Sequence, residues 1–434
     1  MTGSCHEPAD KDREGPRLRE IALVPIFSIL HDEAAVGRTV DEYAAMVEGI
    51  PDLHFRRREA AEVRPEEEAV FFVVTGGTEG LILDAVRQRN GPVVLLAHPG
   101  QNSLPAALEV LARLGQTKRV GKVVYLTGDR RADHRELGRA LRLAATRRRL
   151  GAARIGLIGE PSDWLAASSP DPRRVTEGWG PQVVRIAIDD LVQAYEEVAG
   201  GGPLPPVAAE LKEAFVKGAR EVREPSDEDL TRAAAVYAAL RRLADVHRLD
   251  AMTVRCFDLV LKAGTTGCLA LSALTDEGLI AGCEGDLPST LTMMLLAYVS
   301  GGTPFMANPA RVDRARGSLW LAHCTVGRSL LDDYTVRSHF ESGLGVGIQG
   351  TLPLGPVTLA RIGGGDLDRL YVAEGELTAN GREEDLCRTQ VQVKLDGGVD
   401  YFLRRPLGNH HVLVRGHWQE DLAAYAELIG VAMV

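Results

Sequence analysis

The chain has 434 residues, and its hydrophobic fraction of 45% and charged fraction of 25% are ordinary for a globular protein. This length is enough for about two or three domains, each with a sizeable core. The 60 acidic and 50 basic residues give a net charge of −10, which argues against a nucleic-acid partner, and no apolar run approaches the about 18 residues that would span a membrane.

The N-terminal segment is polar and of mixed charge. Residues 1–19 lack the apolar stretch of a secretory signal, so we expect a disordered leader and a protein that stays in the cytoplasm. The six cysteines are scattered along the chain, and no two of them form a C-x-x-C pair. That pattern is typical of thiols that are kept reduced in the cytosol.

Residues 20–150 alternate short apolar runs with amphipathic helical segments. Runs of valine, leucine and isoleucine between helices indicate a parallel sheet that is covered on both faces. The expected strands are residues 21–28, 69–77, 92–100 and 122–129, and the expected helices are residues 33–48, 79–89, 104–114 and 134–149. We therefore predict a Rossmann-like α/β domain.

Polar side chains follow two of these expected strands. Thr78 and Glu79 lie in a G-G-T-E turn after one strand, and His98 and Asn102 lie after the next. Ligands of open α/β sheets bind at the carboxyl ends of strands, so we expect these residues to contact a polar substrate, although tight turns would explain them equally well. The chain has no glycine-rich dinucleotide fingerprint and no Walker loop, which argues against a nucleotide cofactor.

A second α/β domain is expected over residues 151–302. It has strand patterns within residues 153–165, 182–191 and 251–259 and long helical patterns over residues 207–222 and 227–247. Residues 303–434 combine alternating strand patterns with glycine turns, which is typical of an antiparallel sheet or barrel, before a final helix over residues 419–429. The predicted fold is two Rossmann-like parallel-sheet domains followed by an antiparallel β-barrel-like domain.

The stretch from residue 279 to residue 325 carries the strongest chemical signal. Glu284 and Asp286 directly follow an apolar run, while Asn308 and His323 lie at the ends of the next two expected strands. Carboxylate, amide and imidazole groups in this arrangement suit Mn²⁺ or a similar divalent ion. The plainer interpretation is a turn and a helix N-cap, with acids near the positive end of the helix.

Histidines gather in the C-terminal third of the chain. Five of the 11 histidines are His323, His339, His410, His411 and His417. A lone histidine in a strand is more often structural than a ligand, and the closely spaced Cys and His sets of a structural zinc site are missing from the sequence. A mixed carboxylate and imidazole site from distant segments fits a catalytic ion that leaves positions open for a substrate.

Several motifs occur in the order found in a known family. They are C-E-G-D-L-P-S-T at residues 283–290, F-M-A-N-P at residues 305–309, L-A-H-C-T-V at residues 321–326 and G-N-H-H-V-L-V-R-G-H-W at residues 408–418. With these motifs the chain resembles the L-fucose isomerase and L-arabinose isomerase superfamily, whose two Rossmann-like domains and β-rich domain match the predicted fold. The resemblance implies an aldose–ketose isomerase that uses Mn²⁺, or else Co²⁺ or Mg²⁺, and acts through an enediol.

The resemblance also implies roles for single residues. Glu284 matches a metal-binding carboxylate that also serves in proton transfer, and Asp286 matches the acidic residue beside the reacting carbons. The other implied metal ligands are Asn308, His323 and His410, with His411 as the alternative to His410.

Asn308 departs from the family pattern, because a carboxylate is expected at this position. An amide oxygen can bind a metal ion, but an amide cannot act as a base near neutral pH. The base must then be Asp286, Glu284 or Glu341, of which Glu341 begins a glycine-rich loop near His339. We expect His339 and His411 to contact the substrate.

Two other functions are compatible with these residues. One is a metal-dependent epimerase or lyase on the same scaffold, and the other is a catalytically inactive sugar-binding protein, which Asn308 favours. The expected substrate is a monosaccharide similar to L-fucose or L-arabinose, or a modified hexose. An anionic tail on this sugar would pair with Arg255, Arg361 or Arg415. The family implies a homo-oligomer, either a hexamer or a trimer.

Overall fold

The computed structural model describes residues 19–434, and the chain divides into two compact units between Ala145 and Thr146. The leader predicted for residues 1–19 lies outside the described residues, except that Arg19 begins strand β1 (Arg19–Ile26). The second and third predicted domains both lie within the second unit, so the division into three domains stays a prediction. Among the helices of residues 19–434, none is long and apolar enough to cross a membrane.

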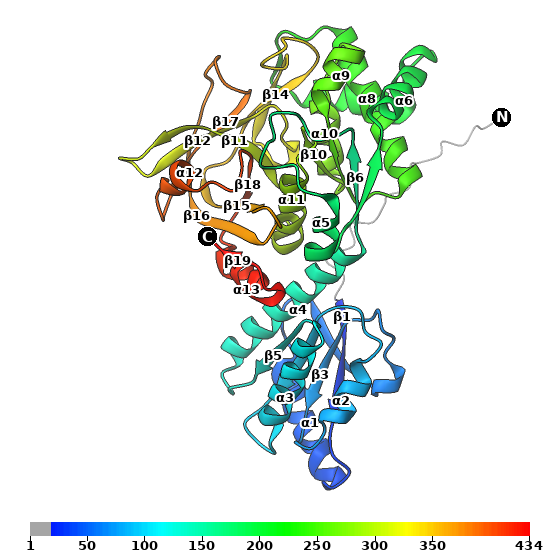
Figure 1. Cartoon of the computed structure of the whole chain (residues 1–434), viewed down its shortest axis with the longest axis vertical. Helices are drawn as coiled ribbons and strands as arrows, with labels where there is room; N and C mark the ends of the chain where they lie inside the picture. Colours follow the sequence, from blue (N-terminus) through cyan, green and yellow to red (C-terminus); the bar gives the residue numbers. More distant parts are fainter. Residues whose placement is uncertain (1–18) are drawn as a thin grey trace, which may run out of the picture. The chain divides into compact units, whose positions relative to one another are not determined.

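The first unit is built on a five-stranded parallel sheet with the order β2-β1-β3-β4-β5. Figure 1 labels β1, β3 and β5 of this sheet. Successive residues of β3 face two different cores, with Phe71 in one and Phe72 in the other, which explains its continuous apolar run. Strand β2 was not among the predicted strands, because it is an edge strand with polar residues. The elements are β1, α1 (Glu33–Val47), β2 (Leu53–Arg57), β3 (Ala69–Val73), α2 (Glu79–Val86), β4 (Val93–Ala97), α3 (Ser103–Gln116), β5 (Gly121–Tyr125) and α4 (Arg130–Ala152), the last of which crosses into the second unit.

The second unit begins with a four-stranded parallel sheet of order β10-β9-β6-β7. The strand that was expected over residues 251–259 ends at Val254, and Cys256 already begins a helix. The elements are β6 (Arg154–Ile158), α5 (Pro172–Trp179), β7 (Gln182–Ile186), α6 (Ile188–Gly200), α7 (Pro206–Gly218), α8 (Asp227–His247), β9 (Ala251–Val254), α9 (Cys256–Ala263), α10 (Cys268–Asp276), β10 (Ile280–Cys283) and α11 (Leu287–Ser300).

Six antiparallel strands close into a barrel in the order β15-β18-β11-β12-β17-β16, because β16 pairs back to β15. The predicted fold class is therefore confirmed, with two parallel sheets and a C-terminal barrel. The barrel strands are β11 (Phe305–Asp313), β12 (Ser318–His323), β15 (Gly355–Gly363), β16 (Arg369–Asn380), β17 (Thr389–Leu395) and β18 (His411–Arg415). Smaller elements are β8 (Glu221–Val222), β13 (Asp333–Arg337), β14 (Gly347–Thr351), α12 (Asp400–Arg404), α13 (Gln419–Ile429) and β19 (Ala432–Met433).

Helix α11 joins the parallel sheet of the second unit to the barrel. It packs against β9 and β10 of the parallel sheet and also against β15 and β18 of the barrel. Figure 1 shows α11 beside β10, β15 and β18. A helix that is covered on both sides must be apolar nearly all round, which explains its sequence L-P-S-T-L-T-M-M-L-L-A-Y-V-S. Because of this packing, the turn before α11 lies next to the ends of barrel strands.

Candidate metal centre

The turn after β10 presents Glu284 at the edge of the parallel sheet. Glu284 has φ +64° and Gly285 has φ +73°, so both residues have a left-handed backbone. This conformation costs a non-glycine residue about 1–3 kcal/mol and clusters at functional sites. A Cβ atom on Gly285 would lie 2.8 Å from the carbonyl oxygen of Glu160 and 2.8 Å from Cα of Pro161, so only glycine fits between the two loops.

Three of the predicted metal ligands lie together. Oε1 of Glu284 is 3.4 Å from Nε2 of His410 and 3.9 Å from Nε2 of His323. The potential ligand atoms of these three residues all lie within 4.8 Å of one another, and all three residues are buried. His323 is the last residue of β12, and His410 directly precedes β18. We call Glu284, His323 and His410 the ligand group.

A buried hydrogen-bond network contacts Nδ1 of His410, the ring nitrogen that faces away from Glu284. Oδ1 of Asp286 accepts a hydrogen bond from the backbone N–H of Ser289 at 2.7 Å, which caps helix α11. Oδ2 of Asp286 lies 2.9 Å from Nδ1 of His410 and 3.1 Å from Nη1 of Arg361. Asp286 and Arg361 are both fully buried. A carboxylate that binds the second ring nitrogen of a histidine fixes which nitrogen faces a metal ion.

The charges in this cluster shift the pKa of each group. Burial by itself would raise the pKa of Glu284, but His410, His323 and the N–H of Trp164 outweigh it and lower the pKa to about 2. Burial also opposes the charged form of His410, yet Asp286 and Glu284 raise its pKa to about 9. For His323, burial and the positive His410 lower the pKa to about 4. Near neutral pH the cluster therefore holds a charged Glu284, a protonated His410 and a neutral His323.

The ligand group has the chemistry of a divalent-ion site. Nε2 of His410 is buried and has no hydrogen-bond partner, although Oε1 of Glu284 lies 3.4 Å away. A buried nitrogen whose only contact of this kind is a long ion pair is open to a further ligand. One carboxylate and two imidazoles are ligands for several divalent ions of the first transition row. Glu284, His323 and His410 could therefore hold a metal ion.

Glu341 and His339 lie on a loop near the ligand group. Glu341 is exposed, although part of its side chain is buried. This partial burial and the negative charge of Glu284 raise the pKa of the Glu341 carboxyl. Burial and the guanidinium of Arg388 lower the pKa of His339, which the charge of Glu284 opposes. Nδ1 of His339 lies 3.0 Å from the hydroxyl oxygen of Ser342, within the same loop. Both predicted residues are therefore within electrostatic reach of Glu284.

Asn308 and His411 form hydrogen bonds with residues outside the ligand group. Oδ1 of Asn308 accepts a hydrogen bond of 2.7 Å from the side-chain amide of Asn409. The ring of His411 is buried, with Nδ1 3.0 Å from the carbonyl oxygen of Asn409 and Nε2 3.2 Å from the hydroxyl of Tyr401. Of the two adjacent histidines, His410 rather than His411 lies beside Glu284.

The four residues of the first unit that were predicted to bind substrate lie just after two strands of its sheet, β3 and β4. Thr78 is buried and donates to the carbonyl of Thr75 at 2.8 Å, and Nε2 of His98 lies 2.9 Å from the carbonyl of Val74. Glu79 begins helix α2, and Asn102 is exposed before α3. The side chains of Thr78 and His98 therefore hold their loops, and a role in substrate binding stays a prediction.

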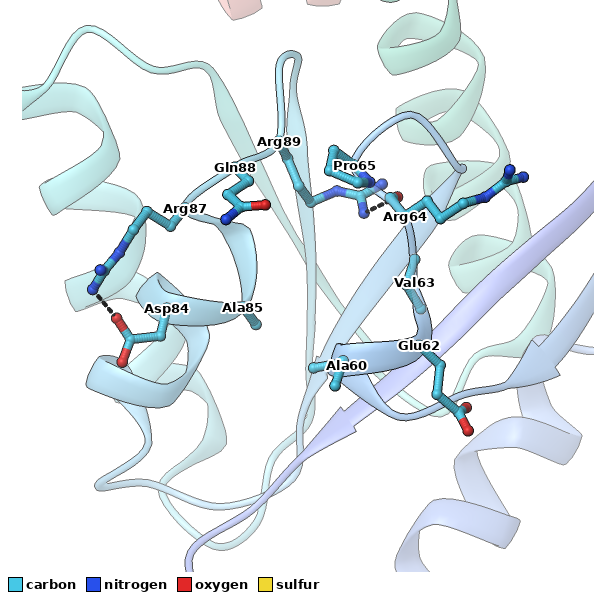
Figure 2. Close-up of a pocket in the computed structure, with 11 residues that line it drawn as sticks. Ala60, Glu62, Val63, Arg64, Pro65, Asp84, Ala85, Arg87, Gln88 and Arg89 are labelled. Atoms are coloured by element: carbon cyan, nitrogen blue, oxygen red, sulfur yellow. Dashed lines mark hydrogen bonds and ion pairs between the residues drawn. The ribbon is translucent and has the colours of Figure 1, made fainter.

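The first unit also has an open hollow of about 560 Å³, which Figure 2 shows. Three arginines line it, and each has a hydrogen-bond or ion-pair partner, which for Arg64 is Glu67 at 2.6 Å. Arg87 pairs with Asp84, and Arg89 donates to the backbone carbonyl of Arg64 at 3.0 Å. The predicted substrate residues do not line this hollow.

Sequence reasoning missed two neighbours of the ligand group. Trp164 donates from Nε1 to Oε2 of Glu284 at 2.6 Å. Arg361, considered above only as a partner for an anionic sugar, instead binds Asp286, the carbonyl of His410 and Ser168. The pairing of Arg361 with Asp286 depends on the folded structure, so no local pattern in the sequence indicates it. Trp164 lies in the segment E-P-S-D-W-L after a strand, and this segment was a weak signal of a functional loop.

Comparison with known proteins supports this chemistry, although no protein-family model matches the chain. The chain is 28% identical over 241 residues to a sulfoquinovose isomerase of Alkalicoccus urumqiensis, and the aligned region covers 54% of this chain and 53% of that protein. It is 25% identical over 285 residues to a sulfoquinovose isomerase of Priestia megaterium (63% and 61% covered). It is 25% identical over 178 residues to an L-arabinose isomerase of Serratia proteamaculans (40% and 35% covered). The chain is a distant homologue of these sugar isomerases.

These matches are consistent with the L-fucose and L-arabinose isomerase superfamily that the motifs indicated, so the resemblance is confirmed at this level. The matched region spans 53% and 61% of the length of the two sulfoquinovose isomerases. The barrel, the parallel sheets and the buried ligand group thus occur in a chain that is homologous to sugar isomerases.

Proposed function

We propose that this protein is a metal-dependent aldose–ketose isomerase that acts on a monosaccharide through an enediol. The observation that carries the proposal is the ligand group, a carboxylate and two imidazoles with ligand atoms within 4.8 Å in a homologue of sugar isomerases. A sugar can be bound by hydrogen bonds and ring contacts alone, whereas enediol chemistry gains from an ion that polarises the carbonyl oxygen. This distinction favours an enzyme over the inactive binder.

We propose Glu284, His323 and His410 as the ligands of Mn²⁺ or of Co²⁺ or Mg²⁺. When bound, such an ion polarises the carbonyl and hydroxyl oxygens of a sugar and stabilises developing negative charge. Asp286 would keep Nδ1 of His410 engaged, so that Nε2 points toward the ion. Asn308 is a further proposed ligand, through its amide oxygen, which already accepts a hydrogen bond from Asn409 with one of its two lone pairs.

Proton transfer needs a base within the site. In the aldose-to-ketose direction the base takes the proton from carbon 2 and returns a proton to carbon 1, while the proton of the carbon-2 hydroxyl moves to the oxygen on carbon 1. Glu341 is the proposed base because it is exposed and because a raised pKa makes its carboxylate more basic. Glu284 has a pKa of about 2 and is thus a weaker base, and both oxygens of Asp286 already accept hydrogen bonds.

The substrate proposed first is a sugar of the kinds named for the relatives, sulfoquinovose or L-arabinose. The sulfo group in the first name is an anionic tail of the type considered for Arg255, Arg361 and Arg415. Arg361 is fully buried among its partners, so it is the least suited of the three to reach a substrate. Arg255 pairs with Asp163 at 2.9 Å, and Arg415 is exposed at the far end of β18.

The test uses purified full-length protein that has been stripped with EDTA and reloaded with Mn²⁺, Co²⁺ or Mg²⁺. Sulfoquinovose, L-arabinose, L-fucose and other pentoses and hexoses are incubated in D₂O, and aldose loss, ketose gain and deuterium at carbons 1 and 2 are measured. We expect ion-dependent conversion with deuterium uptake, and loss of both in Glu284→Gln. Exchange that yields only a carbon-2 epimer would indicate an epimerase, and binding without exchange would indicate a sugar-binding protein.

The resemblance also leads us to propose a homo-oligomer, either a trimer or a hexamer. Size-exclusion chromatography with light scattering measures this directly. A monomer that is fully active would contradict it.

A further inference from the structure

One tryptophan makes a direct contact with the ligand group. Trp164 lies in the loop between β6 and α5, and its Nε1–H donates to Oε2 of Glu284 at 2.6 Å. The side chain keeps one part in water, because 54% of the residue is exposed. The hydrogen bond to the buried carboxylate fixes the N–H edge of the Trp164 indole, while a face of the ring stays exposed to solvent.

The loop that carries Trp164 is fastened on both sides of it. The backbone N–H of Ser162 donates to the carbonyl of Glu284 at 2.9 Å, and Nη1 of Arg255 donates to the carbonyl of Pro161 at 2.6 Å. Further along, the hydroxyl of Ser168 accepts a hydrogen bond of 2.6 Å from the buried Arg361. The loop thus binds the turn of Glu284 before Trp164 and the network behind His410 after it.

The two oxygens of Glu284 consequently have separate partners. Oε1 faces His410 and His323, whereas Oε2 receives the indole N–H. A glutamate side chain has three rotatable bonds, and a donor at one oxygen restricts where the other oxygen points. The indole is therefore placed to hold Oε1 toward the two histidines.

The exposed face of Trp164 continues an aromatic surface. Its ring packs edge-on against Phe257, with centroids 4.8 Å apart, and Phe257 packs in the same way against His339 at 5.6 Å. Trp164 also lines a mainly apolar groove of about 500 Å³ together with Asn409, the residue before His410, although none of the three ligand-group residues lines this groove. A site that is largely apolar with a few polar groups is typical for a small ligand.

We propose that Trp164 is a positioning residue for Glu284 and that its free ring face forms part of the sugar-binding surface. The inference rests on the proposed metal-dependent isomerase function, but its first part concerns ion binding and needs no turnover. The indole N–H orients the carboxylate that binds the ion. The ring contacts the apolar C–H face of the sugar.

The test compares Trp164→Phe, which removes the N–H but keeps a ring, with Trp164→Ala, which removes both. Trp418→Phe is the matched control, because this half-buried indole also donates a hydrogen bond, to the carbonyl of Arg415 at 2.8 Å. For each protein we measure Mn²⁺ affinity by calorimetry, tryptophan emission during Mn²⁺ titration, and kcat and KM at saturating Mn²⁺.

Wild-type emission should change on addition of Mn²⁺, and Trp164→Phe should lose that change while Trp418→Phe keeps it. We expect Trp164→Phe to bind Mn²⁺ about 10–100-fold more weakly, the range for residues that orient a metal ligand, with KM near the wild-type value. Trp164→Ala should show the same weakening of Mn²⁺ binding and, in addition, a several-fold higher KM.

The outcomes separate the two proposals. Wild-type protein that binds no Mn²⁺ and converts no sugar would overturn the proposed function itself. Wild-type protein that binds Mn²⁺, together with unchanged affinity and emission response in Trp164→Phe, would overturn the positioning role alone. An unchanged KM in Trp164→Ala, in an enzyme that turns over, would overturn the contact between ring and sugar.

Discussion

The substitution Asp286→Asn tests the network behind the ligand group most directly. Asp286 is fully buried and serves three donors, namely the backbone N–H of Ser289, the ring of His410 and the guanidinium of Arg361. Asparagine has nearly the same shape but one acceptor oxygen instead of two. Its NH₂ group would therefore face at least one donor, and the charge of Arg361 would lose its counter-ion.

The size of the effect follows from this burial. The other partners of Arg361 are neutral, namely two serine hydroxyls and the carbonyl of His410. Removal of one partner from a buried ion pair costs about 3–5 kcal/mol of unfolding free energy. Loss of the group that orients a metal-binding histidine weakens metal affinity by about 10–100-fold. We expect both effects in Asp286→Asn at pH 7.

The contribution of Asp286 to the stability of the protein depends on pH. Burial would raise the pKa of Asp286, but Arg361 and His410 outweigh it and hold the pKa well below its ordinary value. The carboxylate therefore contributes its full stability above about pH 3.9, the value in an unfolded chain, and loses it as the pH falls toward the folded value. The penalty of Asp286→Asn should be complete at neutral pH and should shrink in strong acid.

The assay is urea unfolding followed by circular dichroism, combined with calorimetric titration of Mn²⁺. Glu284→Gln is the matched control, because it removes a proposed ligand without leaving Arg361 unpaired. It should abolish Mn²⁺ binding, and its loss of stability should be smaller than that of Asp286→Asn, because only the ion pair with His410 and the hydrogen bond from Trp164 are lost. If Asp286→Asn unfolds at the wild-type urea concentration and binds Mn²⁺ normally, the buried network does not orient His410 and the reasoning is wrong.

Three further predictions concern the ion and the base. The affinity for Mn²⁺ should rise about tenfold per pH unit from pH 6 toward pH 9, because the ion displaces a proton from His410, whose pKa is about 9; a flat calorimetric profile would contradict this. Glu341→Gln should lower kcat by about 10²–10⁴-fold, as loss of a general base does, while Mn²⁺ affinity stays unchanged; normal turnover would assign the base elsewhere. Asn308→Asp should retain or raise isomerase activity and tighten Mn²⁺ binding, and a loss of both would show that the amide itself is needed.

The sequence determined the larger part of the fold through local patterns. Continuous apolar runs between helices specified the parallel strands, because such strands are covered on both faces. Glycine turns between alternating runs specified the antiparallel region. The turn at Glu284 was also visible, since an acid, a glycine and an N-cap residue follow a buried strand. The N-cap interpretation of Asp286 was correct, and the same carboxylate also binds His410.

The tertiary structure alone decided which side chains meet. His410 and His411 are adjacent in sequence, but neighbouring residues of an extended chain point to opposite sides, so only the packing of β18 shows that His410 faces Glu284. The contacts of Arg361 and Trp164 join loops and strands that are distant in sequence, and no local pattern encodes them. Local propensity fixes where each element begins and ends, whereas the partners of a buried charge depend on how the parallel sheet, α11 and the barrel pack together.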